Sequence, residues 1–165
     1  MTARLRRLAD IFAVLGGIIL LVIVAVTTTN TTAFILDRIA RTFGANVAGL
    51  PGYEDFVRLA ISGAALMFFP YCQAHRGHVA VELFMDRLPQ IIQRGFDKMW
   101  LLVTVAVALF LAWWMVFGLL EARSDTVVTS VLGWPTWPFY LPGVASMLLW
   151  ALIAASQVFG GARDA

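Results

Sequence analysis

Four long apolar stretches alternate with short polar segments along the chain, over residues 11–28, 56–74, 99–120 and 139–159. Each has about the 20 residues with which an α-helix crosses the roughly 30 Å hydrocarbon core of a bilayer. Backbone polar groups in lipid must bond to one another, so each stretch should be a helix. No long stretch alternates apolar and polar residues as barrel strands do. The pattern therefore predicts an all-α membrane protein with four transmembrane helices, forming one membrane domain over residues 1–165.

The composition agrees with a lipid environment. The chain is 61% hydrophobic and 13% charged, with a mean hydropathy of +0.83. Soluble domains are about 45–50% apolar and about 25% charged. A net charge of +2 gives no reason to expect a nucleic-acid partner, and a single cysteine, Cys72, excludes an internal disulfide. We therefore expect membrane lipid to surround most of the chain.

The basic residues predict that both termini lie in the cytoplasm, because Lys and Arg are enriched in cytoplasmic segments. With the N-terminus inside, the inner segments carry Arg4, Arg6, Arg7, Arg76, Arg87, Arg94, Lys98 and Arg163. The outer segments carry only Arg38, Arg41, Arg58 and Arg123. Three aromatic residues ahead of the fourth stretch, Trp134, Trp137 and Tyr140, fit an interfacial belt on the outer side.

The first apolar stretch predicts a signal anchor that stays in the membrane. A cleaved signal peptide is the alternative, but the apolar run is long for that role and no clear small-residue cleavage site follows it. Further along, Phe34, Ile35, Ile39 and Phe43 share helical spacing. This spacing predicts either an interfacial helix or an extension of the first span.

The second stretch opens with charged residues. Glu54 and Asp55 stand at its start, where carboxylates suit the positive end of the helix dipole. Glu54 and Arg58 are four residues apart, which predicts an ion pair on one helix face. The alternative is a polar contact to a partner helix, because unshielded ions are costly in lipid.

The four stretches hold few polar groups near their centres. These are small hydroxyls such as Ser62, Thr104 and Ser146, with no central carboxylate. Transport sites usually need polar groups near the bilayer midplane, so the pattern favours a supporting role. Pro70 and Pro142 predict kinks in the second and fourth helices. Close helix packing is favoured by three pairs of small residues four apart: Ala60 and Ala64, Ala108 and Ala112, and Ala151 and Ala155.

A polar block, Arg76–Glu82, follows the second stretch and leads into a segment with helical apolar spacing. We expect the span to end there and a short amphipathic helix to lie along the bilayer surface. His78 and Glu82, four residues apart, are expected to lock this surface helix to the span. Alternatively, Arg76 and His78 only mark the inner interface. The candidate interface residues of the chain are Glu54, Arg58, Arg76, His78, Glu82, Asp86 and Arg87.

Cys72, His75 and His78 are the residues closest to a metal-binding pattern. On one helix their side chains fan out by about 100° per residue and do not converge, whereas zinc needs three or four converging ligands. Both histidines lie at one end of a span, which does not suit a haem held across the membrane. No nucleotide-binding loop is present. We expect no catalytic residue, no metal and no cofactor, and hence no enzyme.

Three motifs and the four-span plan carry a family resemblance. The motifs are Gly52-x-Glu54, the block His78-Val79-x-Val81-Glu82, and the group Pro135, Trp137, Tyr140, Pro142 and Gly143. With them the chain resembles, over about residues 10–159, the small membrane subunit of tripartite ATP-independent periplasmic (TRAP) transporters, the DctQ-like family. The family more often has aspartate at the position of Glu82, and Arg58 lies outside its pattern.

The resemblance implies two protein partners, a large multi-span membrane subunit and a periplasmic substrate-binding protein. It also implies a location in the bacterial inner membrane and uptake of organic acids driven by an ion gradient. The small subunit would brace the scaffold against which the large subunit's mobile part moves. The alternative is a stand-alone four-helix membrane protein, such as a small exporter or an assembly factor.

Overall fold

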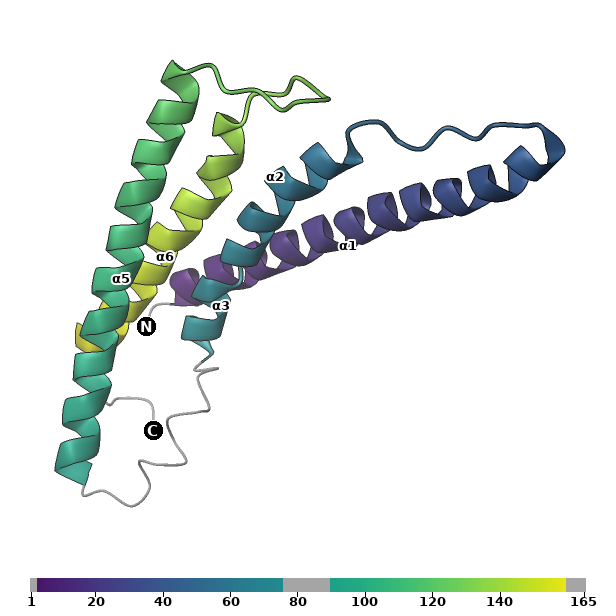
Figure 1. Ribbon diagram of the computed structural model, residues 1–165. Coiled ribbons are helices and arrows are strands. Elements are labelled where there is room, and N and C mark those ends of the chain that lie inside the picture. The colour runs from purple at the N-terminus through teal and green to yellow at the C-terminus, as the bar shows by residue number, and fades with distance from the viewer. Residues whose placement is uncertain (1–2, 76–89, 160–165) are drawn as a thin grey trace.

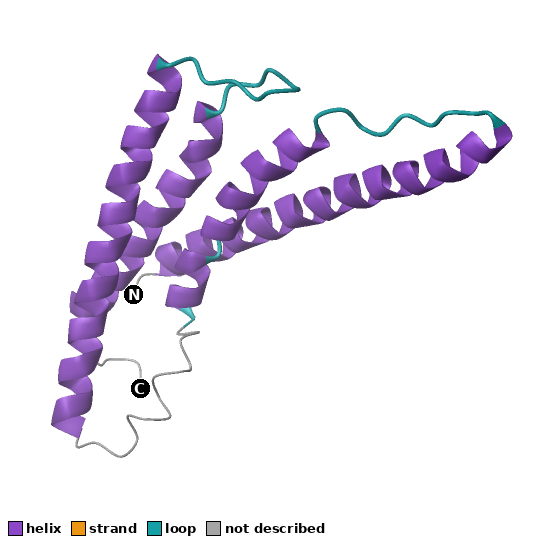
Figure 2. Ribbon diagram, viewed as in Figure 1, coloured by secondary structure: helices purple, strands orange, loops and turns teal. Residues whose placement is uncertain are grey.

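A computed structural model describes residues 3–75 and 90–159 of the chain. Four helices in this part are long and apolar enough to cross a membrane, which confirms the predicted fold class. Figure 2 shows helices joined by loops, with no strand in the described residues. The α-helices are α1 (Ala3–Ala40), α2 (Tyr53–Leu66), α3 (Phe69–Ala74), α5 (Gln90–Ser124) and α6 (Tyr140–Phe159). Two short 3₁₀ helices are η1 (Arg41–Phe43) and η2 (Trp137–Phe139).

The helices form two pairs that meet at one end of the molecule (Figure 1). One pair is α1 with α2, and the other is α5 with α6. The pairs converge where α1 begins and α6 ends, which we call the terminal end. They separate toward the end that holds segments 44–52 and 125–136, which we call the loop end.

The first helix is much longer than the predicted span. α1 has 38 residues, so it extends about 57 Å and includes the apolar group that begins at Phe34. Of the two predicted interpretations of that group, the chain adopts the extension of the first span. The polar run before Phe34 does not end the helix, because Thr29 and Thr32 donate hydrogen bonds of 2.8 Å to carbonyl oxygens of the preceding turn. η1 follows α1 directly. The residue after η1 is Gly44, whose backbone is in the left-handed conformation (φ +76°).

The second span consists of two helices instead of one. α2 ends at Leu66 and α3 begins at Phe69, with a turn between them. Pro70 causes the interruption, because it has no N–H to donate to the Leu66 carbonyl four residues earlier. The hydroxyl of Ser146 on α6 donates to that carbonyl instead, over 2.6 Å. Pro142 does not interrupt α6: it is the third residue of that helix, where its missing N–H would have no helical partner.

The core lies at the terminal end, where three helices meet. Ala9 on α1, Ala74 on α3, and Leu149 and Ile153 on α6 are buried against one another. The predicted small pairs take part in helix contacts: Ala60, Ala64, Ala108, Ala112 and Ala151 are buried, and Ala155 is half-buried. Small side chains let the helix backbones approach closely at these positions.

Only a narrow seam of α1 is covered. Its buried residues are Ala9, Gly16, Ile23 and Asn30, which recur every seven residues. That spacing is close to two helical turns, so these residues form one line along the helix. Gly16 faces α2: a Cβ atom there would lie 3.1 Å from the Ala64 carbonyl oxygen. Half-buried residues such as Leu5 and Phe12 border this line, and the opposite side of α1 is exposed.

Candidate interaction surface

A carboxylate at the start of α2 holds the loop between α5 and α6. Asp55 accepts hydrogen bonds from the backbone N–H groups of Val131, at 2.8 Å, and Leu132, at 3.1 Å. Just before it, Gly52 adopts φ +78°, and a Cβ atom there would overlap the Leu132 side chain. A carboxylate that accepts two backbone N–H groups makes a strong, charge-assisted contact. We call this contact, Asp55 with Val131 and Leu132, the loop clasp.

The segment between α1 and α2 is held back along the end of α1. The side chain of Asn30 accepts a hydrogen bond from the Leu50 N–H at 2.9 Å, and Asn30 is only 2% exposed. Asp37 accepts from the Val47 N–H at 3.0 Å and pairs with Arg41 at 2.8 Å. Both connections at the loop end therefore have defined backbone positions, set by side chains on the membrane helices.

The predicted ion pair between Glu54 and Arg58 is wrong for the described structure. Glu54 accepts a hydrogen bond from the Tyr53 hydroxyl at 3.2 Å, and in the described residues no acidic group lies within ion-pair distance of Arg58. At the start of α2 the two carboxylates have other partners: Glu54 bonds to Tyr53, and Asp55 bonds to the loop. Both Glu54 and Arg58 are exposed, so their role as interface residues stays a prediction.

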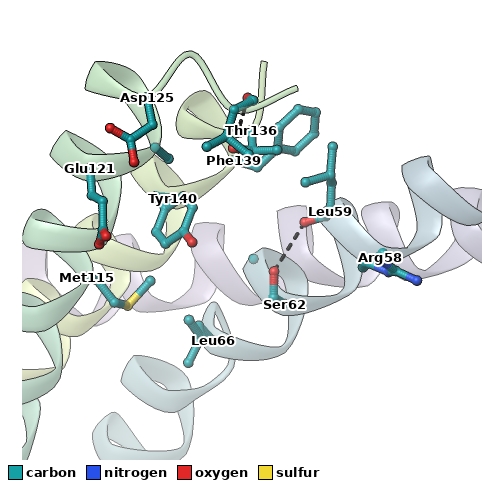
Figure 3. A pocket seen from close by; sticks show the side chains of 14 residues that line it. Arg58, Leu59, Ser62, Leu66, Met115, Glu121, Asp125, Thr136, Phe139 and Tyr140 are labelled. Carbon is teal, nitrogen blue, oxygen red and sulfur yellow. Dashed lines mark hydrogen bonds between the residues drawn. The ribbon is translucent and has the colours of Figure 1, made fainter. Parts of the chain in front are cut away.

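A cavity of about 530 Å³ lies between α2 and α5 at the loop end (Figure 3). Its charged lining residues are Arg58, Glu121 and Asp125. In Figure 3 the Tyr140 hydroxyl points into the cavity, whereas Arg58 extends away from the other labelled residues. Among the described residues these charged groups form no ion pair with one another. The cavity separates α2 from α5, so the two helix pairs are joined at this end through α6 and the loop clasp.

At the terminal end a polar network joins α3 to its neighbours. The Gln73 amide donates to Gln157 at 2.7 Å, and Gln157 donates back to the Gln73 backbone carbonyl at 2.9 Å. The Trp150 indole donates to the Gln73 side chain at 3.2 Å. His75, predicted above as one member of a possible metal pattern, instead lies 2.9 Å from Asp10 on α1. Sequence reasoning missed Asp55 as a loop ligand and the whole glutamine network.

Large apolar side chains cover the outer faces of α1 and α5. On α5 the exposed aromatic residues are Phe96, Trp100, Phe110, Trp113, Trp114 and Phe117. On α1 the exposed group includes Leu21, Val24, Phe34, Ile35 and Ile39. In both helices only 11% of the most apolar window is buried within the chain. These two faces are therefore the area that is available to lipid or to another membrane protein.

Five of the candidate interface residues lie outside the described residues: Arg76, His78, Glu82, Asp86 and Arg87. The predicted surface helix that holds them lies in the same segment. Their roles remain predictions.

Comparison with protein families decides the class of the protein. A family model described as "Tripartite ATP-independent periplasmic transporters, DctQ component" matches residues 35–164. The chain belongs to this family. Comparison of the chain with the curated proteins and with the solved structures found no match. The match covers α2, α3, α5 and α6 and the end of α1, so it takes in both the loop clasp and the glutamine network.

Membership of the DctQ family fixes the general role. The protein is the small membrane subunit of a TRAP transporter and not an enzyme. It is a multi-pass membrane protein that works with a large membrane subunit and a periplasmic binding protein. The family resemblance drawn from the sequence is thereby confirmed.

Proposed function

We propose that this DctQ subunit is a static scaffold that braces the large subunit while that subunit carries organic acids inward on an ion gradient. The proposal places it in the bacterial inner membrane with both termini in the cytoplasm, as the distribution of Arg and Lys favours. The interface residues under this proposal are Glu54, Arg58 and the five residues of the segment after α3.

The single observation that carries the proposal is that the buried polar side chains already have hydrogen-bond partners within the chain. In the described residues these are Asn30, Gln73, Thr104 and Ser146. Each has a hydrogen-bond partner within the chain, and no buried side-chain polar atom in this part is left without one. A site for an ion or a carboxylate substrate needs polar groups that are free to bind it near the midplane. Here those groups hold helices together, which suits a brace.

The exposed apolar faces of α1 and α5 add a second line of support. A subunit that surrounded its own transport path would bury most of its helix surface against itself. These two helices instead leave wide aromatic and aliphatic faces outside the chain, which supplies contact area for a large partner in the membrane. Membership of the DctQ family speaks against the stand-alone exporter or assembly factor that the sequence left open. That alternative predicts an isolated chain that is stable by itself.

Co-purification distinguishes the two. The tagged chain would be expressed with its neighbouring genes and extracted in mild detergent, and the proteins that stay bound would be identified by mass spectrometry. A large membrane protein bound in a fixed ratio supports the scaffold, and a monodisperse chain without a partner contradicts it.

The static role needs a second measurement on the assembled transporter. Nitroxide labels at Ile61→Cys on α2 and Leu148→Cys on α6, in a Cys72→Ser background, report the distance between the two helix pairs. Both positions are exposed, at 48% and 45%. A scaffold keeps one distance with and without substrate and ion gradient, while a label pair across the large subunit's mobile part changes. A distance change within this chain would refute the static role.

A further inference from the structure

We infer that α3 is a separately fastened segment: the joint at residues 67–68 uncouples it from α2, and side chains of α6 hold it in place. The inference concerns the fold of this chain and does not rest on the proposed scaffold function. It assigns a positioning role to Gln73, Gln157 and Trp150.

The backbone between α2 and α3 is weakly connected. Pro70 removes one helical hydrogen bond, and the Phe68 N–H reaches back only three residues, to the Ala65 carbonyl at 3.4 Å. The Met67 N–H is shared between the carbonyls of Gly63, at 3.3 Å, and Ala64, at 3.2 Å. Long and shared bonds of this kind resist bending less than a regular helical ladder. The backbone alone therefore leaves the direction of α3 loosely set.

The length of α3 makes external support necessary. It has six residues and extends about 9 Å, less than two helical turns, so it has few hydrogen bonds of its own to fix its direction. Its stability and direction must come from contacts with other helices.

Those contacts occur along the whole of α3. At its start, the ring of Phe69 packs on Trp150 with centroids 4.9 Å apart. Near its end, Gln73 and Gln157 exchange two hydrogen bonds, and Trp150 adds a third. The partners of α3 in these contacts, Trp150 and Gln157, both lie on α6, whereas Ser146 of α6 holds the end of α2 at the Leu66 carbonyl. We call this set of hydrogen bonds between Gln73, Gln157 and Trp150 the glutamine latch.

The surroundings of the glutamine latch favour its hydrogen bonds. Gln73 is only 6% exposed, so little water competes for its amide. In a membrane a glutamine side chain without a partner is costly, which makes the paired state strongly favoured. At the C-cap of α3, His75 pairs with Asp10 and adds a tie to α1. The direction of the inner part of the second span is therefore set by α6 and α1, and not by α2.

The chain provides its own probe for a test. Cys72 is its sole cysteine, lies on α3 and is exposed. The full-length chain would be purified with its partner subunits, with the partners' cysteines replaced, and labelled with nitroxide at Cys72 and at Leu148→Cys on α6. Pulsed EPR then gives the distribution of distances between α3 and α6. The α2 to α6 pair, Ile61→Cys with Leu148→Cys in Cys72→Ser, reports the remainder of the fold.

The key variant is Gln157→Leu, and its matched control is Ser156→Ala. Ser156 is the adjacent residue and donates only to the carbonyl of Ile153 in its own helix, at 2.7 Å. We expect Gln157→Leu to broaden the α3 to α6 distribution and to add a second population, while the α2 to α6 distribution keeps its width. Ser156→Ala should change neither.

Two results would overturn the inference. If neither distribution changes in Gln157→Leu, the latch does not position α3. If both broaden together, α2 and α3 move as one continuous span. A milder variant, Trp150→Phe, keeps a ring against Phe69 and removes only the donor to Gln73. It is measured in the same way, so that failure of Gln157→Leu to assemble still leaves the inference open to refutation.

Discussion

Ser146 on α6 donates a hydrogen bond of 2.6 Å to the backbone carbonyl of Leu66, the carbonyl that Pro70 leaves without a helical partner. The two residues are 80 positions apart in the sequence. One hydroxyl thus supplies the bond that a proline removes, at a depth where the alternative would be an unpaired acceptor in lipid.

This relationship predicts a non-additive pair of substitutions. Ser146→Ala alone should destabilise the purified complex by about 0.6–2 kcal/mol, because the Leu66 carbonyl loses its donor. Pro70→Ala restores an N–H at the position that bonds this carbonyl in a helix. In the Pro70→Ala background, Ser146→Ala should therefore cost much less. Thermal unfolding in detergent measures all four proteins of the cycle, with Ser62→Ala as control, since Ser62 donates only to Leu59 of its own helix. Equal costs in both backgrounds would contradict the compensation.

The loop clasp predicts a local effect of Asp55→Ala. Removing the carboxylate takes the acceptor from two backbone N–H groups, so amide hydrogen exchange at Val131 and Leu132 should rise steeply. The effect should be confined to this loop, because both backbone N–H groups that bond to the carboxylate lie in it. Glu54→Ala is the matched control, because Glu54 is the adjacent carboxylate and accepts only from the Tyr53 hydroxyl. Similar exchange rates in the two variants would mean that the clasp does not hold the loop.

The contact between α1 and α2 predicts opposite outcomes at two adjacent glycines. A Cβ atom at Gly16 would lie 3.1 Å from the Ala64 carbonyl oxygen and 3.2 Å from the Met67 Cβ, whereas at Gly17 nothing lies within 4 Å. Gly16→Leu should therefore separate the helices and cost about 1–3 kcal/mol or more, by overpacking. Gly17→Leu should be nearly neutral. Complex yield and melting temperature check both, and equal tolerance would place α1 differently against α2.

The polar block Arg76–Glu82 lies outside the described residues, and its role in assembly stays a prediction. Glu82→Lys and His78→Ala should each reduce recovery of the complex and substrate uptake, because both remove a contact expected to fix the surface helix. Lys98→Gln, a charge change within α5, serves as control. Normal assembly and uptake in both variants would remove the block from the interface.

Local patterns in the sequence predict the spans well because the bilayer imposes a simple rule of length and polarity. The all-α fold with four helical segments long and apolar enough to cross a membrane is confirmed, although the second consists of two helices. The small pairs that include Ala64, Ala112 and Ala151 are found in helix contacts, because small side chains let two helix backbones approach closely. Pro70 was a correct signal for an interruption, whereas Pro142 was not, because the effect of a proline depends on its distance from the helix start.

The contacts that join the helices could not be predicted in the same way. Spacing of four residues suggested a pair between Glu54 and Arg58, but Asp55 reaches the loop 76 residues later, and Gln73 reaches Gln157 84 residues later. Such partners depend on how the helices pack, which no local period encodes. α1 is also longer than the predicted span. The hydroxyls of Thr29 and Thr32 donate to carbonyl oxygens of the same helix, so polar residues there do not end it.

The distance between Leu66 and Ser146 in the sequence also has a consequence for biosynthesis. A membrane protein is inserted as it is translated, and its N-terminal parts are in place before its C-terminal parts exist. α1 and α2 can pack as soon as both have left the ribosome, since Gly16 and Ala64 need nothing further. The Leu66 carbonyl, by contrast, must wait for the last helix to be made. A chain that stops before α6 therefore keeps an unpaired acceptor at the joint between α2 and α3.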